Sequence, residues 1–176
     1  MITKIEELFE NYCKNHNFSG TAIVKTSDGI LFHKAYGYAH RGFKVENSID
    51  TKFDTASVTK LFTAIAVLQL VDKGLLNLDD RITDILSLEG TKIPKEVTIR
   101  HLLTHTSGIA DDADEEAGEK YEDLFINKPN YSIRQNKDLL PQFVYKEPNF
   151  KAGTEVRYNN CAFASGHIYN KNIMKW

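Results

Sequence analysis

The chain has 176 residues, of which 41% are hydrophobic and 26% are charged, so it is long enough for one substantial core or two small lobes. Lys and Arg (22) nearly balance Asp and Glu (24), and no basic stripe stands out, which excludes the charge pattern of a nucleic-acid-binding protein. No stretch of membrane-spanning length is free of charges, so no membrane span is predicted.

The beginning of the chain is predicted to form a helix followed by a β-hairpin. Apolar residues recur at helical spacing over about residues 2–14, which indicates an amphipathic helix and not a signal peptide. Two strand-like runs, residues 18–25 and 30–38, flank Ser27-Asp28-Gly29, which is a strong signal for a hairpin turn. The localisation stays open: cytoplasmic as the sequence stands, or exported if a leader was removed.

A long apolar helix is predicted to begin near Ser57. Residues 61–71 are apolar nearly all round, which is typical of a buried helix, and Gly74 provides a C-terminal cap. Two short helices are expected later in the chain. Asp79 or Asp80 is predicted to cap the first, and Thr98 is predicted to cap the second.

The tetrapeptide Ser57-Val58-Thr59-Lys60 gives the strongest indication of chemistry. A serine hydroxyl is a weak nucleophile until a neighbouring base takes its proton, and side chains three residues apart on a helix share one face. Lys60 is therefore placed to reach Ser57. In a first helical turn the free N–H groups and the helix dipole also favour an oxyanion, and the Ser57 N–H is a candidate donor. By itself the motif is weak, because about one Ser-x-x-Lys is expected by chance at this length. The alternative is an ordinary helix start with a first-turn cation.

Three motifs in a fixed order make the interpretation more specific. They are Phe53-x-x-Ala56-Ser57-Val58-Thr59-Lys60, then Arg100-His101-Leu102-Leu103-Thr104-His105-Thr106-Ser107-Gly108-Ile109, and then Gly153-Thr154-x-x-x-Tyr158-x-Asn160. Together they resemble the penicillin-recognising serine hydrolases of class C β-lactamase type, a family that includes β-lactamases, D-alanyl-D-alanine peptidases and esterases. The resemblance runs from about residue 18 to residue 163.

The resemblance implies roles for four residues. Ser57 would be the acylated nucleophile, Lys60 the partner that lowers the barrier to its deprotonation, and Tyr158 a second proton-transfer group. Asn160 would hold the substrate amide. Lys and Tyr, with ordinary pKa values of about 10.4 and 10, act as bases near neutral pH only when burial or a nearby cation lowers those values. An adjacent Lys and Tyr can perturb each other in that direction and titrate together, so the base is not assigned to one of them.

The resemblance also implies an α+β fold of β-lactamase/transpeptidase type in incomplete form. Residues 1–49 would supply the N-terminal helix and hairpin of the α/β lobe, and residues 50–176 a mostly helical lobe with the first two catalytic motifs. The implied function is a serine hydrolase that acts without a cofactor on an amide or ester: a β-lactam, a D-Ala-D-Ala peptide or a small ester. The alternative, from a different class, is a non-catalytic remnant or interaction module of the same fold.

The third catalytic element of that family is expected to be missing. It is a Lys-Thr-Gly or His-Ser-Gly type triplet on a strand beyond the second motif, and it supplies the other oxyanion amide. The chain contains no such triplet, since Ser165-Gly166-His167 has the wrong order and place. A truncated or frameshifted member is the simplest interpretation. We therefore expect weak catalysis and, because strands that would complete the sheet are also lacking, self-association through the exposed hairpin.

Two further patterns were weighed as metal sites. His101 and His105 are four residues apart, but the Glu that adjoins the first His in zincins is lacking, so no metal is predicted and a structural turn beneath the active site is expected. The acidic run at residues 111–116 fits a calcium loop in part. Ala117 stands where Gly is needed and Asp123 where Glu is preferred, so a solvated surface loop is favoured.

Overall fold

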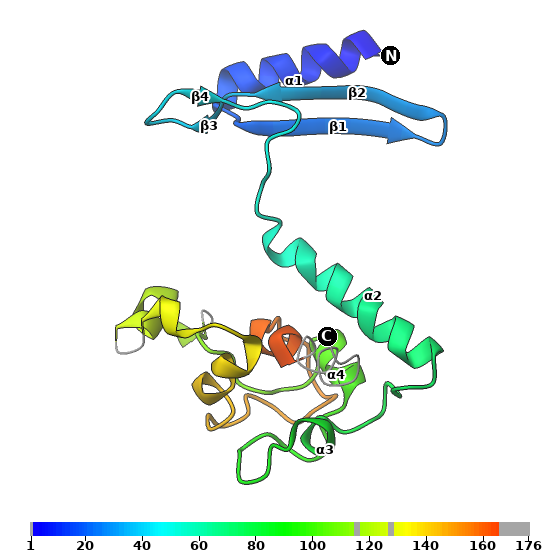
Figure 1. The fold of residues 1–176 in the computed structure, drawn as a ribbon, viewed down its shortest axis with the longest axis vertical. Coiled ribbons are helices and arrows are strands. Elements are labelled where there is room, and N and C mark those ends of the chain that lie inside the picture. The colour runs from blue at the N-terminus through cyan, green and yellow to red at the C-terminus, as the bar shows by residue number, and fades with distance from the viewer. Residues whose placement is uncertain (1, 115–116, 127–128, 166–176) are drawn as a thin grey trace. The chain divides into compact units, whose positions relative to one another are not determined.

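A computed structural model describes residues 2–114, 117–126 and 129–165, and the chain divides into two units, Met1–Thr55 and Ala56–Trp176. Figure 1 gives the order of the elements along the chain. The division into lobes at residues 1–49 and 50–176 stays a prediction.

The first unit consists of a helix packed on a β-hairpin, as predicted. Helix α1 (Ile2–His16) is followed by the antiparallel strands β1 (Gly20–Thr26) and β2 (Gly29–Tyr36). The ring of Phe9 on α1 stacks on the ring of Phe32 on β2, with 5.1 Å between the centroids. The apolar side of the helix therefore covers one face of the hairpin, which buries Phe32.

A second, very short strand pair was not predicted. It joins β3 (Tyr38–His40) to β4 (Val45–Glu46), and Gly37 separates it from β2. Gly37 has a φ of 62°, and a Cβ there would lie 2.7 Å from Ser19 Oγ and 2.9 Å from the Phe18 carbonyl oxygen. Only glycine fits this position. The strand predicted to run through residue 38 therefore breaks one residue earlier.

The second unit opens with the element that carries Ser57. The 3₁₀ turn η1 (Ala56–Val58) leads into helix α2 (Thr59–Asp72). The helix ends at the predicted glycine: Gly74 has a φ of 68° and donates its N–H to the Val71 carbonyl at 2.9 Å, while the Leu75 N–H bonds the Leu70 carbonyl at 3.0 Å. This pair of bonds is the Schellman arrangement that glycine favours.

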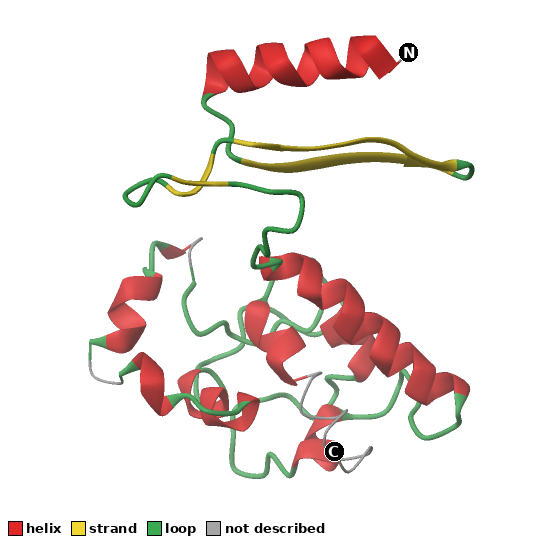
Figure 2. Cartoon of the chain, turned by 45° about the horizontal axis from the view of Figure 1, so that its top comes forward, coloured by secondary structure: helices red, strands yellow, loops and turns green. Residues whose placement is uncertain are grey.

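The expectation that this helix is buried all round is wrong. Only Val67 and Leu70 of α2 are buried. Five large apolar side chains at helical spacing are 43% to 65% exposed and form a stripe along the helix: Val58, Leu61, Phe62, Ile65 and Leu68. Within the described part of this unit, α2 lies along one side and packs on the core with its opposite side (Figure 2).

Two short helices follow, and one of the two predicted caps is present. Thr98 caps α4 (Ile99–Leu103) in a capping box: the His101 N–H reaches Thr98 Oγ1 at 3.4 Å, and the Thr98 N–H reaches His101 Nδ1 at 3.2 Å. The cap predicted for α3 (Ile82–Leu86) at Asp79 or Asp80 is wrong. The helix starts after Arg81, and the Asp80 carboxylate accepts the Asn77 N–H instead.

The core of the second unit draws on segments from most of its length. After α4 the described chain forms three short 3₁₀ segments, η3 (Tyr121–Phe125), η4 (Asn130–Ser132) and η5 (Asn136–Gln142), and a helical turn over residues 160–165. The largest fully buried apolar side chains are Phe143, Leu70, Ile82, Ile99, Leu102, Ile109, Val67 and Val97. Every helix in the described part of the chain falls short of the length and apolar character needed to cross a membrane.

Candidate active site

The Ser57 hydroxyl lies between the side chains of Lys60 and Tyr158. Lys60 Nζ donates a hydrogen bond to Ser57 Oγ at 3.1 Å, so the contact that helical spacing predicts is present. The hydroxyl of Tyr158, 101 residues further along the chain, lies 2.6 Å from the same Ser57 Oγ. A hydroxyl, an amine and a phenol therefore share one hydrogen-bonded arrangement.

The side chain of Asn160 joins this arrangement from the other side of Lys60. Its Oδ1 accepts a hydrogen bond from Lys60 Nζ at 2.7 Å, and its Nδ2 donates to the hydroxyl of Tyr121 at 2.6 Å. Both ends of the amide are thus used inside the protein. Tyr121 was not singled out in the sequence, because it belongs to no motif and reaches the site from η3 only through the tertiary fold.

Lys60 also acts on the site through its charge. Its ammonium nitrogen lies 4.7 Å from the centroid of the Tyr158 ring and 5.8 Å from that of Phe163, both within cation–π range. Burial opposes ionisation of the Tyr158 phenol, but its hydrogen bonds with Lys60 and Ser57 and the charge of Lys60 outweigh that effect and hold the pKa of Tyr158 below its ordinary value. Tyr158 is therefore a better proton acceptor near neutral pH than a free tyrosine.

A buried carboxylate fixes the start of the helical turn that carries Asn160. Asp111 accepts the backbone N–H of Asn160 at 2.9 Å and that of Cys161 at 3.1 Å, so it caps the turn. The neighbouring Asn159 is also buried: its Nδ2 donates to the Ile109 carbonyl at 2.9 Å, and its Oδ1 accepts the Ala162 N–H at 2.7 Å. These contacts hold the backbone beneath the site.

The two histidines of the second motif each accept a backbone hydrogen bond at Nδ1, which stabilises the fold. His101 Nδ1 accepts the Thr98 N–H in the capping box of α4. His105 Nδ1 accepts the Asn159 N–H at 3.1 Å, and its ring lies 4.7 Å from the ring of Tyr158. These contacts agree with the predicted structural turn beneath the site.

One cluster brings potential metal ligands together without favouring an ion. Ligand atoms of Asp111, Asp112 and Cys161 lie within 4.8 Å of one another. The oxygens of Asp111 are already bonded to backbone N–H groups. Burial raises the pKa of the Asp112 carboxyl and also that of the Cys161 thiol. Both shifts oppose the deprotonation that binding of a cation requires.

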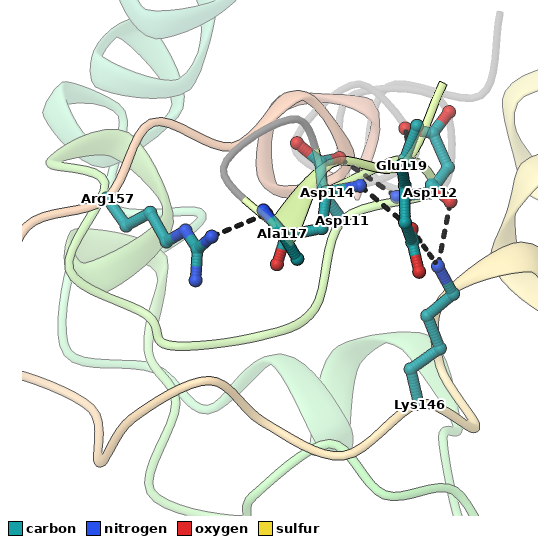
Figure 3. A network of polar contacts seen from close by, with 8 residues as sticks. Asp111, Asp112, Asp114, Ala117, Glu119, Lys146 and Arg157 are labelled. Carbon is teal, nitrogen blue, oxygen red and sulfur yellow. Dashed lines mark hydrogen bonds and ion pairs between the residues drawn. The ribbon is translucent and has the colours of Figure 1, made fainter. Parts of the chain in front are cut away.

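The part of the acidic run that the structure describes, residues 111–114, is not a solvated loop. Asp111 is buried, Asp112 and Asp114 are half-buried, and two cations hold the segment (Figure 3). Lys146 Nζ donates to the Asp112 carbonyl at 2.8 Å, and Arg157 pairs with Asp114. Residues 115 and 116, which the calcium-loop interpretation requires, lie outside the described residues. The prediction of a solvated loop is wrong for residues 111–114, because backbone amides and cations offset the cost of burying the charges.

An open cleft gives access to the Ser57 hydroxyl. Its volume is about 490 Å³, and its lining includes Ser57, Lys60, Asn160 and Phe163. Ser57 and Tyr158 are exposed and Lys60 is half-buried. The arrangement therefore leaves the Ser57 hydroxyl open to a molecule that enters from solvent.

Comparisons with known proteins identify the family of the chain. The family model described as Beta-lactamase matches residues 5–169. The chain is 41% identical over 110 residues to penicillin-binding protein 4 of Amycolatopsis lactamdurans, covering 61% of this chain and 29% of that protein. It is 32% identical over 152 residues to penicillin-binding protein 4* of Bacillus subtilis (strain 168), covering 82% of this chain and 31% of that protein.

A solved structure shows the same fold at higher coverage. The crystal structure of a penicillin-binding protein from Bacillus halodurans matches with a TM-score of 0.85 and 38% identity, over 94% of this chain and 50% of that one. The chain thus spans less than a third of the length of those two curated relatives and half of the solved structure. The predicted α+β, β-lactamase/transpeptidase-like fold, incomplete relative to these proteins, is confirmed. This chain belongs to the beta-lactamase family, with penicillin-binding-protein-like serine hydrolases as its relatives.

Proposed function

We propose that Ser57 is the nucleophile of an acyl-transfer site that acts on a β-lactam, a D-Ala-D-Ala peptide or a small ester. The observation that carries the proposal is the contact of the Ser57 hydroxyl with both Lys60 and Tyr158, at 3.1 and 2.6 Å. A hydroxyl in contact with two titratable groups, one of which takes its proton once it has lost its own, is the arrangement that nucleophilic catalysis requires.

In the proposed reaction Ser57 Oγ bonds to the carbonyl carbon while its proton passes to the pair of Lys60 and Tyr158 in its singly deprotonated form, which is a neutral amine beside the phenol or a phenolate beside the ammonium. The carbonyl electrons move to oxygen, and the backbone N–H of Ser57 is the proposed donor to that oxyanion. Collapse of the tetrahedral intermediate breaks the carbon–nitrogen or carbon–oxygen bond, and the leaving group takes the proton back from the pair. An acyl-enzyme remains, and water attacks it in a second round.

The lowered pKa of Tyr158 supports its share in both transfers. A lowered pKa makes the phenolate, the form that can accept the serine proton, easier to form near neutral pH, and the resulting phenol returns that proton to the leaving group. Lys60 and Tyr158 are linked through Ser57 and through the cation–π pair, so the proposal does not assign the proton acceptor to one of them alone.

The role proposed for Asn160 has two parts. Through Oδ1 it holds the Lys60 ammonium in reach of Ser57. Through Nδ2 it is proposed to bind the carbonyl of the substrate amide, and this requires the Tyr121 hydroxyl, which now accepts that N–H at 2.6 Å, to move aside. Substitution of Tyr121 by Phe is therefore expected to raise affinity for an amide substrate, since it removes the competing acceptor.

Covalent labelling tests the proposal without requiring turnover. The purified chain is incubated with benzylpenicillin and, separately, with a p-nitrophenyl ester, and the intact mass is measured. We expect an adduct of one acyl group on Ser57 that is absent from Ser57→Ala. Ser27→Ala, which changes an exposed serine in the β1–β2 turn, is the matched control and should label normally.

A negative labelling result would overturn the proposal. If neither compound labels the folded chain, or if Ser57→Ala labels as well as the parent, the acyl-transfer proposal fails. The non-catalytic interaction module of the same fold would then be the better proposal.

A further inference from the structure

His105 is tied to the backbone on both sides of Tyr158. Its Nδ1 accepts the N–H of Asn159 at 3.1 Å, and its own carbonyl accepts the N–H of Arg157 at 2.9 Å. Its ring lies against the Tyr158 ring, with 4.7 Å between centroids and 31° between planes. His105 is thus bonded to the segment that presents the phenol to Ser57 on both sides of Tyr158.

The bond to Asn159 defines the protonation state of His105. A ring nitrogen that accepts an N–H carries no proton, so the proton of the neutral ring is on Nε2. The backbone of His105 has a φ of 58°, in the left-handed region that residues other than glycine rarely adopt. A strained backbone conformation is retained where the surrounding contacts fix it.

The charged and titratable groups around the ring come from three segments. Lys60 on α2 has its ammonium over the rings of Tyr158 and Phe163, the same two rings that His105 packs against. Asp111 acts from the loop after α4 and Tyr158 from the segment above. Burial first, and then the charge of Lys60, hold the pKa of His105 below its ordinary value, while the charge of Asp111 opposes them.

We propose that His105 is a positioning residue whose neutral ring keeps the Tyr158 phenol on Ser57, and that protonation of His105 releases it. The proposal rests on the function proposed above and adds a pH control of the same site. It acts through Tyr158, since His105 itself does not touch the nucleophile.

Protonation would break the arrangement in two ways. An Nδ1–H would face the Asn159 N–H, so two donors would oppose each other where one bond now exists. The imidazolium would also add a positive charge beside the Lys60 ammonium, across the two aromatic rings that they share. Both effects push the segment carrying Tyr158 away from its present position.

The first arm of the test measures the geometry and needs no acylation. Two-dimensional ¹H–¹⁵N spectra of the imidazole rings give the tautomer and the titration midpoint of His105, and the amide spectrum follows Asn159 over the same pH range. We expect a neutral Nε2–H ring at pH 7.5, a midpoint below about 6.5, and an Asn159 amide shift with the same midpoint. An Asn159 amide that does not follow the His105 titration would overturn the proposal.

The second arm of the test distinguishes the effect of the hydrogen-bond acceptor at residue 105 from the effect of its aromatic ring. His105→Asn keeps an acceptor, does not titrate and suits a positive φ, whereas His105→Phe keeps a ring and loses the acceptor. We expect acylation of Ser57 in the parent to fall on the acid side with the His105 midpoint, and this fall to be absent from His105→Asn. His105→Phe should acylate roughly tenfold more slowly at pH 7.5.

His33→Asn, an exposed histidine on β2, is the matched control and should keep the pH profile of the parent. An unchanged acid-side fall in His105→Asn would overturn the proposal. If circular dichroism shows that His105→Phe does not fold, the imidazole and amide spectra of the parent and the pH profile of His105→Asn still test the proposal. If no variant acylates, the proposed function has failed, and the first arm alone judges the role of His105.

Discussion

The carboxylate of Asp111 provides the sharpest test of how the fold supports the site. Asp111 is 9% exposed and accepts the backbone N–H of Asn160 and that of Cys161. Removal of the carboxylate in Asp111→Ala leaves both amides without this acceptor in a buried place. Each such amide costs about 1–3 kcal/mol, so we expect a loss of roughly 3 kcal/mol in the free energy of unfolding after the neighbours relax.

The variant Asp111→Asn refines the expectation. It keeps one oxygen as acceptor but turns an NH₂ group toward the second amide, so its loss should be smaller, about 1–2 kcal/mol. Asp79→Ala is the control, because that carboxylate pairs with Arg100 on the surface and contributes little. The ranking of the three variants is thus fixed by burial and not by charge.

Urea unfolding followed by far-ultraviolet circular dichroism measures these differences. In addition, Asp111→Ala should label more slowly at Ser57 than the parent, because the turn that presents Asn160 has lost its cap. The reasoning is refuted if Asp111→Ala unfolds at the same urea concentration as Asp79→Ala, since the two amides would then not depend on the carboxylate.

Three further predictions concern the chain as a whole. Gly108→Ala should prevent the second unit from folding, as judged by circular dichroism, because its Cβ would lie 2.0 Å from the Phe150 carbonyl oxygen; Gly74→Ala, with a similar φ and open space around it, should cost only about 1–2 kcal/mol. Turnover by these 176 residues alone should be slow, since they contain no Lys-Thr-Gly or His-Ser-Gly triplet and the lack of one oxyanion donor lowers rates by about 10²–10³; hydrolysis of a chromogenic cephalosporin at ordinary enzyme rates, abolished in Ser57→Ala, would contradict this. Self-association through the hairpin is expected in sedimentation and should weaken in Ile23→Lys, which places a charge on its exposed apolar face; a monomer at high micromolar concentration would exclude it.

Local patterns in the sequence were sufficient for much of the fold. The helix and hairpin of the first unit follow from apolar periodicity and from the Ser27-Asp28-Gly29 turn, and the structure has both. Thr98 as a helix cap and Gly74 as a helix terminator are also present, because each depends on bonds within a few residues. The contact of Lys60 with Ser57 belongs to the same class, since it spans three positions of one helix.

The errors arose where burial depends on distant partners. The apolar composition of α2 predicted burial on all sides, but composition does not say which sides other segments cover, and one stripe of the helix is exposed. The acidic run predicted a solvated loop, because charge is costly to bury without partners. Those partners are Lys146 and Arg157, which lie more than 25 residues away in the sequence.

The sequence by itself determined the chemistry on offer: a serine and a lysine on one helical face, and a tyrosine and an asparagine in a motif that resembles a known family. The tertiary structure determined which other residues hold these groups in position. Asn160 is held by Asp111 and Tyr121, which lie 49 and 39 residues away, and neither belongs to the predicted site. Such contacts leave no periodic signal, because they arise from packing between segments, and packing is specified by the whole core at once.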